Sequence, residues 1–389
     1  MKTTVTFWGV RGSVPSFDLR SWRYGGNTAC VEVRTPAGER IIIDGGTGVR
    51  ELGRFIRLEE PDRPVEATLL LSHYHWDHIQ GLPFSPILYD PRNHLSLFGL
   101  RPISAGGMAE VLEGQMSGPY FPVDLKVLAA ARQFTELDAG AALQVGDAQV
   151  RTRGLYHPQG CLGFRIETSE GVVVYASDNE PGDPAGDRNI RELAQGADIF
   201  ICDAQFAPAF LEKRRGWGHS SWADALQVAR DAGAKHVVLF HHDPDSDDAV
   251  IDGYVEQAQQ EFETVWAAAE GMVLTSAGGR VEYASVAPRV GPRPPTKFAG
   301  RLRAHREDGS EVEALVDVEN LTIKGAFVQA AERLPLHSQV KLELSDFGSG
   351  PVVLEGKVVR CESKNERRRI GIGIVFYHQT KTPAEQGEG

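Results

Sequence analysis

The fold of this chain is decided by the stretch Thr68-Leu69-Leu70-Leu71-Ser72-His73-Tyr74-His75-Trp76-Asp77-His78. Its apolar first part predicts a buried strand, and polar side chains follow at once. Imidazole nitrogens and carboxylate oxygens are ligands that a borderline cation such as zinc accepts. In an extended segment, His73 and His75 lie on the same side, and the pair that follows can turn toward a second ion. The stretch therefore predicts a metal site at the end of a strand.

Further donors are expected downstream, because these four side chains cannot complete two metal sites. His157 follows a strand-like run, and Asp178 closes another, where its two carboxylate oxygens could bridge two ions. His241 directly follows a third run, and the adjacent His242 is the alternative ligand. A single histidine is more often an ordinary hydrogen-bonded residue, but the shared position after strands favours one ligand set.

Short apolar runs alternate with helical patterns over the first 285 residues, which is typical of an α/β layer architecture. The predicted strands are residues 3–7, 31–33, 41–43, 69–71, 172–175, 199–201 and 237–240. The predicted helices are residues 48–58, 221–232 and 249–269, the second of them capped by Ser220 and Ser221. Asp44 and Asp203 close two of the strands and could orient ligand histidines from outside the metal site, or simply stabilise turns.

Residues 1–285 resemble the metallo-β-lactamase superfamily, whose signature His-x-His-x-Asp-His is matched by the opening stretch. The resemblance implies an αββα sandwich that holds a two-ion site at one edge of its sheets. It also implies two divalent ions, with Zn²⁺ expected and Mn²⁺ or Fe²⁺ as alternatives. The implied ligands are His73, His75 and His157 for the first ion, Asp77, His78 and His241 for the second, and Asp178 as the bridge.

The segment Gly218-His219-Ser220-Ser221 bears on the reaction. It resembles the Gly-His-Ser/Thr element of the phosphodiesterase branch of this superfamily, which includes ribonuclease Z. A histidine there suits proton transfer to a leaving group, so His219 and Asp77 are the candidate catalytic residues. The alternative is that His219 only caps the helix. The glycine-rich turns at residues 7–13, 24–28 and 44–48 also resemble this branch, and residues 80–125 are expected to cover the site.

The proline-rich residues 286–296 predict a linker, and the chain then changes to strands without long helical patterns. Strands are expected at residues 315–318, 326–328, 340–344, 352–359 and 370–376, which predicts a small all-β barrel over residues 297–380. This part resembles the PilZ domain of bacterial signalling proteins, which implies cyclic di-GMP as an effector. The implied binding residues are Arg289 and Arg293 in the linker and Asn320, Thr322 and Gly325 on the barrel, with threonine where the family has serine.

Length and composition limit the remaining choices. The 389 residues suit two domains, and the net charge of −12 argues against broad nucleic-acid binding. We expect no membrane insertion, and the four scattered cysteines predict reduced thiols in a cytoplasmic protein; a homo-oligomer is compatible with the sequence. The preferred interpretation is a metal-dependent hydrolase of a nucleotide or other phosphodiester. The alternatives are a thioesterase-like enzyme, or a catalytically silent adaptor that binds cyclic di-GMP or a protein partner.

Overall fold

The computed structural model describes residues 2–17, 19–103, 106–286, 298–305, 311–322, 325–331, 334–335, 338–344, 352–364 and 369–381. The chain divides into two compact units, one formed by Met1–Phe17 with Ser21–Val290 and the other by Asp18–Arg20 with Gly291–Gly389. Among the described residues, no helix is long and apolar enough to cross a membrane. All four cysteines are free thiols.

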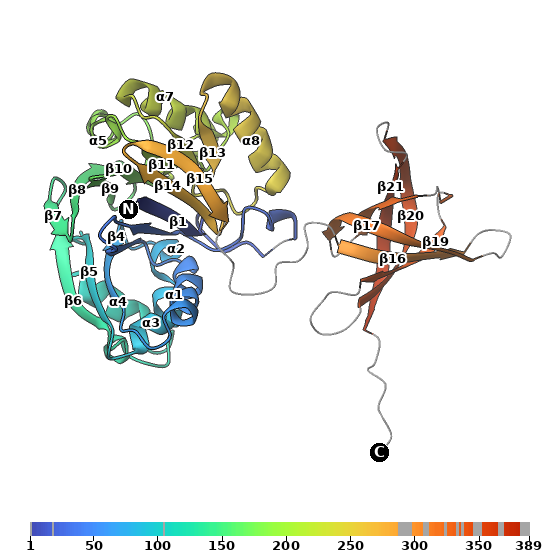
Figure 1. Ribbon diagram of the computed structural model, residues 1–389, viewed down its shortest axis with the longest axis horizontal. Coiled ribbons are helices and arrows are strands. Elements are labelled where there is room, and N and C mark those ends of the chain that lie inside the picture. The colour runs from blue at the N-terminus through green and yellow to red at the C-terminus, as the bar shows by residue number, and fades with distance from the viewer. Residues whose placement is uncertain are drawn as a thin grey trace, which may run out of the picture. The chain divides into compact units, whose positions relative to one another are not determined.

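The first unit is built on two sheets (Figure 1). The first has the strand order β15-β14-β1-β2-β3-β4-β5-β6 and the second has the order β13-β12-β11-β10-β9-β8-β7. The first comprises β1 (Thr3–Gly9), β2 (Cys30–Arg34), β3 (Arg40–Ile43), β4 (Glu66–Leu71), β5 (His94–Leu100), β6 (Ala131–Leu137), β14 (Met272–Ala277) and β15 (Arg280–Val286). The second comprises β7 (Ala142–Val145), β8 (Ala148–Leu155), β9 (Cys161–Thr168), β10 (Gly171–Ala176), β11 (Ile199–Asp203), β12 (Val237–Phe240) and β13 (Val265–Ala267).

Helices cover the outer face of each sheet (Figure 1). Beside the first sheet lie α1 (Gly48–Glu59), α2 (Trp76–Ile79), α3 (Pro86–Tyr89) and α4 (Met108–Gln115), and beside the second lie α5 (Pro184–Ala194), α6 (Pro208–Leu211), α7 (Trp222–Ala232) and α8 (Asp248–Glu261). Short 3₁₀ turns are η1 (Leu19–Ser21), η2 (Leu82–Phe84), η3 (Leu125–Val127) and η4 (Glu212–Arg214). The predicted αββα sandwich is confirmed.

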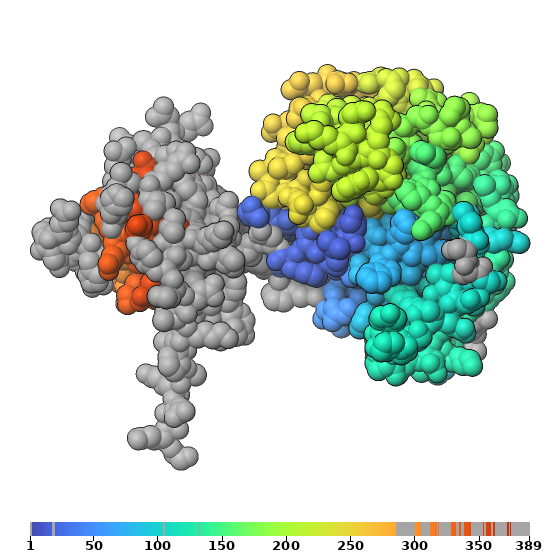
Figure 2. Space-filling view, turned by 180° about the vertical axis from the view of Figure 1, so that it is seen from behind, coloured from blue at the N-terminus to red at the C-terminus, as the bar shows by residue number. Residues whose placement is uncertain are grey.

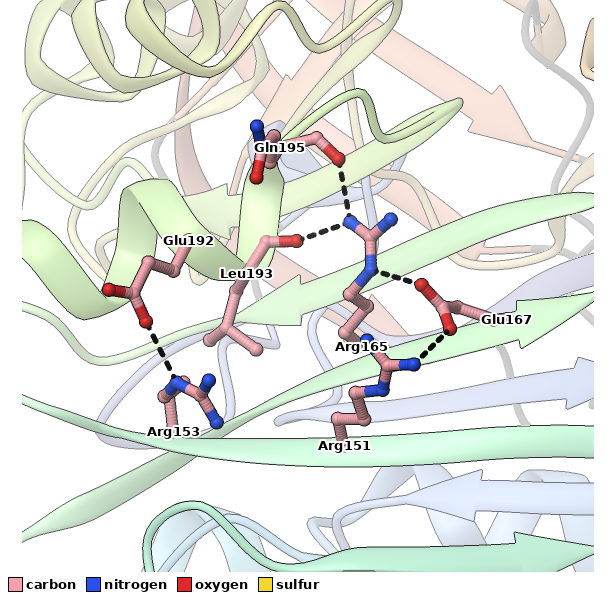
Figure 3. A pocket seen from close by; sticks show the side chains of 7 residues that line it. All are labelled: Arg151, Arg153, Arg165, Glu167, Glu192, Leu193 and Gln195. Carbon is pink, nitrogen blue, oxygen red and sulfur yellow. Dashed lines mark hydrogen bonds and ion pairs between the residues drawn. The ribbon is translucent and has the colours of Figure 1, made fainter.

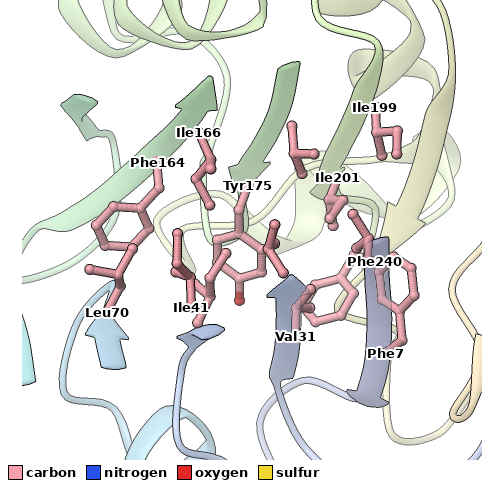
Figure 4. Close-up of a cluster of buried hydrophobic side chains, with 14 of the residues drawn as sticks. Phe7, Val31, Ile41, Leu70, Phe164, Ile166, Tyr175, Ile199, Ile201 and Phe240 are labelled. Carbon is pink, nitrogen blue, oxygen red and sulfur yellow. The ribbon is translucent and has the colours of Figure 1, made fainter. Parts of the chain in front are cut away.

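The main core lies between the two sheets (Figure 4). Phe7 and Ile41 from the first sheet meet Phe164, Tyr175 and Phe240 from the second, and all of them are fully buried. Separate apolar clusters join each sheet to its helices. Burial of this kind stabilises the fold by roughly 1.5–3 kcal/mol for each large apolar side chain. The predicted β-branched runs are buried because both faces of these strands are covered.

Distant parts of the chain also meet on the surface. Figure 2 shows the N-terminal residues in dark blue against the segment around α8 in yellow. The amide of Arg23 donates to the carboxylate of Asp248 over 2.9 Å, across a sequence separation of 225 residues. At another surface, Arg165 donates to the carbonyls of Leu193 and Gln195 at the end of α5 and pairs with Glu167 at 2.7 Å (Figure 3). These residues line a pocket of about 200 Å³, and the hydrogen bonds of Arg165 join β9 to the end of α5.

The strand ends decide where functional side chains gather. Strands β3 and β4 are parallel, and so are β10, β11 and β12, so the carboxyl ends within each set lie at one edge. Asp44 and His241 directly follow β3 and β12, with φ angles of 62° and 61°, and Asp178 lies two residues after the end of β10, with a φ angle of 58°. A left-handed backbone at non-glycine residues is strained, and such strain concentrates at functional sites.

One prediction about secondary structure is wrong. The helix expected over residues 249–269 ends at Glu261, because Val265–Ala267 pairs with β12 as β13. That residues 80–125 cover the site stays a prediction, but these residues also form part of the fold itself. They supply β5, where Leu95 and Leu97 are buried at alternate positions, and α4, which buries Met108 and Leu112 in the same apolar cluster.

The second unit is a closed barrel with the strand order β16-β17-β18-β21-β20-β19. Its strands are β16 (Phe298–His305), β17 (Glu311–Thr322), β18 (Gly325–Ala330), β19 (Gln339–Leu344), β20 (Val352–Lys364) and β21 (Arg369–Lys381). The predicted barrel is confirmed, although β16 was not predicted. Asn320 and Thr322 lie at the end of β17, and Gly325 pairs with Thr322 at the start of β18. Arg289, Arg293 and the rest of residues 287–297 lie outside the described residues.

Candidate metal centre

The first cluster of donors combines three imidazoles. Nε2 of His73 and Nε2 of His157 each lie 3.0 Å from Nδ1 of His75. His73 and His75 come from the loop after β4, and His157 comes from the loop after β8. Strands of different sheets thus place these rings at one point, with His73 and His157 buried.

The second cluster combines Asp77, His78 and His241. Nε2 of His241 lies 3.1 Å from Oδ2 of Asp77 and 3.2 Å from Nε2 of His78. Helix α2 carries Asp77 and His78 as its second and third residues, while His241 follows β12. All three side chains are buried, so their polar atoms face one another and have little contact with solvent.

Asp178 lies between the two clusters. Its Oδ1 is 3.9 Å from Nε2 of His73 and 3.8 Å from Nε2 of His157. Its Oδ2 is 3.2 Å from Nε2 of His78 and 3.5 Å from Nε2 of His241. One carboxylate oxygen therefore faces each cluster, which is the arrangement that a bridging ligand requires.

Contacts on the far side of the rings set which nitrogen faces the clusters. Nδ1 of His157 donates to the carbonyl of Gly218 over 2.8 Å, so its Nε2 offers a lone pair inward. Nε2 of His75 donates to Oε1 of Gln159 over 3.0 Å, which leaves its Nδ1 as the inward donor atom. Ligand histidines commonly make such outer contacts, because these contacts fix both tautomer and ring orientation.

Asp44 does the same for the second cluster. Its Oδ2 accepts from Nδ1 of His78 over 2.8 Å, from the hydroxyl of Tyr175 over 2.7 Å and from the hydroxyl of Ser72 over 2.9 Å. The Ser72 hydroxyl is also 3.0 Å from Nδ1 of His73. A single buried carboxylate thus supports residues of both clusters.

These residues fit divalent ions. Four ligand nitrogens or oxygens at 2.0–2.1 Å from a tetrahedral zinc ion lie about 3.3 Å apart, close to the separations within each cluster. Inward lone pairs and buried carboxylates at such distances repel one another unless a cation lies among them. Burial lowers the pKa of His157 to about 4, and so favours the neutral imidazole that binds metal.

His219 lies beside the clusters, with its ring stacked on that of His241 at a centroid distance of 5.0 Å. Its Nδ1 donates to Oδ2 of Asp203 over 2.8 Å, and the backbone amide of Ser220 donates to the other oxygen. Burial lowers the pKa of His219, but the charge and hydrogen bond of Asp203 outweigh it and raise that pKa to about 9. Two cations bound beside the ring would lower it again. The N-cap of α7 is Ser221, two residues after His219, so Ser221 has the capping role that was the alternative for His219.

His242 points away from the clusters. Its Nε2 donates to the carbonyl of Ala268 over 2.9 Å, and its ring packs edge-on against Tyr24. Burial, with the charge of Arg11 beside it, lowers the pKa of His242 to about 3. Of the two adjacent histidines, the structure brings only His241 to the other donors.

Several residues that support the centre could not be predicted from the sequence. Glu180 accepts hydrogen bonds from the amides of Gly216 and Gly218, and so fixes the loop that leads to His219. The amide of Ser13 donates to Oδ2 of Asp77 over 2.7 Å. Gln159 could have been suspected only from its place two residues after His157. These contacts depend on loops that meet through tertiary packing.

Comparisons with known proteins agree with this architecture. Residues 39–242, just over half of the chain, match the family described as the beta-lactamase superfamily domain, and residues 288–386 match the PilZ domain. Ribonuclease BN of Cronobacter sakazakii is 26% identical over 250 residues, covering 51% of this chain and 77% of that protein. Ribonuclease Z of Natronomonas pharaonis is 24% identical, covering 62% of this chain and 87% of that protein.

Solved structures show the same fold. The metallo-beta-lactamase fold protein YhfI from Bacillus subtilis superposes with a TM-score of 0.53 at 20% identity, covering 70% of this chain and 99% of that one. A diphosphatase from the PhnP family gives a TM-score of 0.52 at 19% identity, covering 71% and 98%. Fold and donor set together define the class as a metal-dependent hydrolase. The chain belongs to the beta-lactamase superfamily, and it carries a C-terminal PilZ domain.

Proposed function

We propose that this protein hydrolyses phosphodiesters at a two-ion site, with zinc as the expected metal. The observation that carries the proposal is Asp178, which has one carboxylate oxygen toward each donor cluster. The proposed ligands are His73, His75 and His157 for one ion, Asp77, His78 and His241 for the other, and Asp178 for both. Ribonucleases BN and Z among the relatives support a phosphodiester as substrate.

The chain's own residues suit such a reaction. Two divalent ions held there would supply a nucleophile at neutral pH and neutralise charge on the phosphoryl oxygens. Asp203 holds Nδ1 of His219, so the opposite nitrogen is free to donate a proton to the departing oxygen. Asp77, which we expected to be catalytic, is fixed by the Ser13 amide and His241. Its proposed role is therefore to position the second ion.

Hydrolysis of bis(p-nitrophenyl) phosphate by the metal-loaded protein tests the proposal. We expect turnover that His75→Ala abolishes, and a loss of about 10²–10⁴-fold in kcat for His219→Ala. The matched control is His236→Ala, because His236 lies at the opposite end of β12 from His241, where it stacks on Trp266 and its Nδ1 donates to the carbonyl of Asp198. Cleavage of a thioester without any cleavage of phosphodiesters would assign the site to the competing class instead.

We also propose that the second unit binds cyclic di-GMP and regulates or localises the enzyme. The match of residues 288–386 to the PilZ domain supports this, since it includes Arg289 and Arg293 as well as Asn320 and Thr322 in β17 and Gly325 in β18. Arginine offers a planar fork that suits phosphate and guanine edges. Titration calorimetry should give heat with the wild type and none with Arg293→Ala. No heat from the wild type at micromolar ligand would refute the proposal.

A further inference from the structure

A cluster of aromatic rings around one arginine adjoins His219. Cζ of Arg214 lies 4.5 Å from the ring centroid of Phe206, 5.6 Å from that of Phe210 and 5.9 Å from that of Trp217. The Phe206 ring meets Trp217 at 6.4 Å on one side and His219 at 6.0 Å on the other. Phe206, Phe210, Arg214 and Trp217, here named the aromatic platform, are therefore continuous with the metal centre through the His219 ring.

The platform is fixed although much of it is exposed. Trp217 is 61% exposed and Phe210 is 51% exposed. Yet the amides of Gly216 and Gly218, on either side of Trp217, both donate to the carboxylate of Glu180. The backbone of Phe206 also forms an isolated β-bridge with Ser221, so both ends of the segment are held. Large aromatic surface held in place without being buried is typical of a binding site.

The positive charge of the platform indicates which class of ligand it would bind. Among the residues that the structure describes, Arg214 forms no ion pair, while its neighbour Arg215 pairs with Glu212 at 2.8 Å. Lys213 adds a further exposed positive charge to a chain whose net charge is −12. An acyl chain would cover the rings but leave the guanidinium donors of Arg214 without acceptors. A nucleobase offers both a ring face and acceptor atoms, and its phosphate offers further acceptors.

We propose that the aromatic platform stacks the nucleobase of a nucleotide whose scissile phosphate lies at the metal centre, with Trp217 as the main stacking residue and Arg214 as the donor to base or phosphate. The substrate class is then nucleotide phosphodiesters rather than phosphodiesters in general. This inference rests on the proposed function, because it assumes that the phosphate binds among the metal ligands.

Binding of adenosine 5′-monophosphate and ribose 5-phosphate to the metal-loaded full-length chain tests the platform, because the two ligands differ only in the base. Stacking of one base contributes about 5- to 150-fold in affinity, which corresponds to ~1–3 kcal/mol. We expect the wild type to prefer the adenosine ligand by this factor, as measured by calorimetry. Trp217→Ala should remove the preference, and Trp217→Phe should retain most of it.

A matched control is Tyr283→Ala, which removes a similarly exposed ring from β15 and should leave the preference intact. Equal affinity of the wild type for both ligands, no binding of either at millimolar concentration, or a preference that survives Trp217→Ala would each overturn the platform. Turnover of bis(p-nitrophenyl) phosphate separates the two ideas. Turnover without base preference removes the platform alone, whereas base preference without turnover removes the proposed hydrolysis and keeps the platform.

Discussion

Replacing Asp44 with asparagine changes a single group in the network beneath the metal centre. Asp44 is fully buried, and its carboxylate accepts hydrogen bonds from the amide and hydroxyl of Ser72, from His78 and from Tyr175. The φ angle of Asp44 is 62°, a conformation that asparagine also tolerates. The substitution therefore tests the hydrogen bonds and the charge without adding backbone strain.

The size of the effect follows from the donors that face Asp44. An asparagine oxygen can still accept from the Ser72 amide, but its NH₂ group then meets the N–H of His78 and the O–H of Tyr175. Hydrogen bonds to charged groups contribute about 1.5–3 kcal/mol each, so we expect a loss of about 3 kcal/mol or more in unfolding free energy. His78 can restore a bond by moving its proton to Nε2, the atom that faces the second cluster. Loss of such an outer contact typically weakens metal binding by about 10–100-fold.

Urea unfolding of the first unit and competition with a chromophoric chelator measure these two losses. Tyr175→Phe is the matched control, because it removes one donor and leaves the Asp44 carboxylate on His78. We expect it to cost about 1.5 kcal/mol with metal affinity within about threefold of wild type. Wild-type metal affinity in Asp44→Asn would show that Asp44 does not set the tautomer of His78, and the reasoning would be wrong.

Three further substitutions separate metal binding from folding. Gly12→Ala places a Cβ 2.4 Å from the ring of His241, so we expect about one bound ion per chain instead of two and a loss of about 10²-fold in kcat; retention of both ions would contradict this. Arg11→Met leaves buried carbonyls such as that of Ser246 without a donor and should destabilise the first unit by about 3 kcal/mol in urea, whereas a change below about 1 kcal/mol would speak against it. Ser221→Ala removes the cap of α7 and should cost about 1 kcal/mol with kcat unchanged; a large loss of turnover would give Ser221 another role.

The sequence predicted much of the scaffold because its strands are buried on both faces. Continuous β-branched runs such as Ile41–Ile43 and Val237–Phe240 leave a strong local signal. Strands β5 and β9 were not predicted, because glycine and polar residues interrupt their apolar pattern. Helix α8 was predicted too long, since the pairing of β13 with β12 depends on contacts far apart in sequence.

The sequence by itself determined the kinds of donor and the strand ends that carry them. His73 to His78 lie so close together in the chain that their chemistry can be read locally. Only the tertiary structure decided which distant side chain joins them, as His241 and His242 show: adjacent in sequence, one faces Asp77 and the other faces Ala268. The backbone of His241 is left-handed, and its ring faces the centre. The ring of His242 instead contacts Tyr24, in the segment between β1 and β2, and Ala268, in the segment before β14. Such contacts are set by packing between segments that are far apart in the chain, so a local sequence pattern does not predict them.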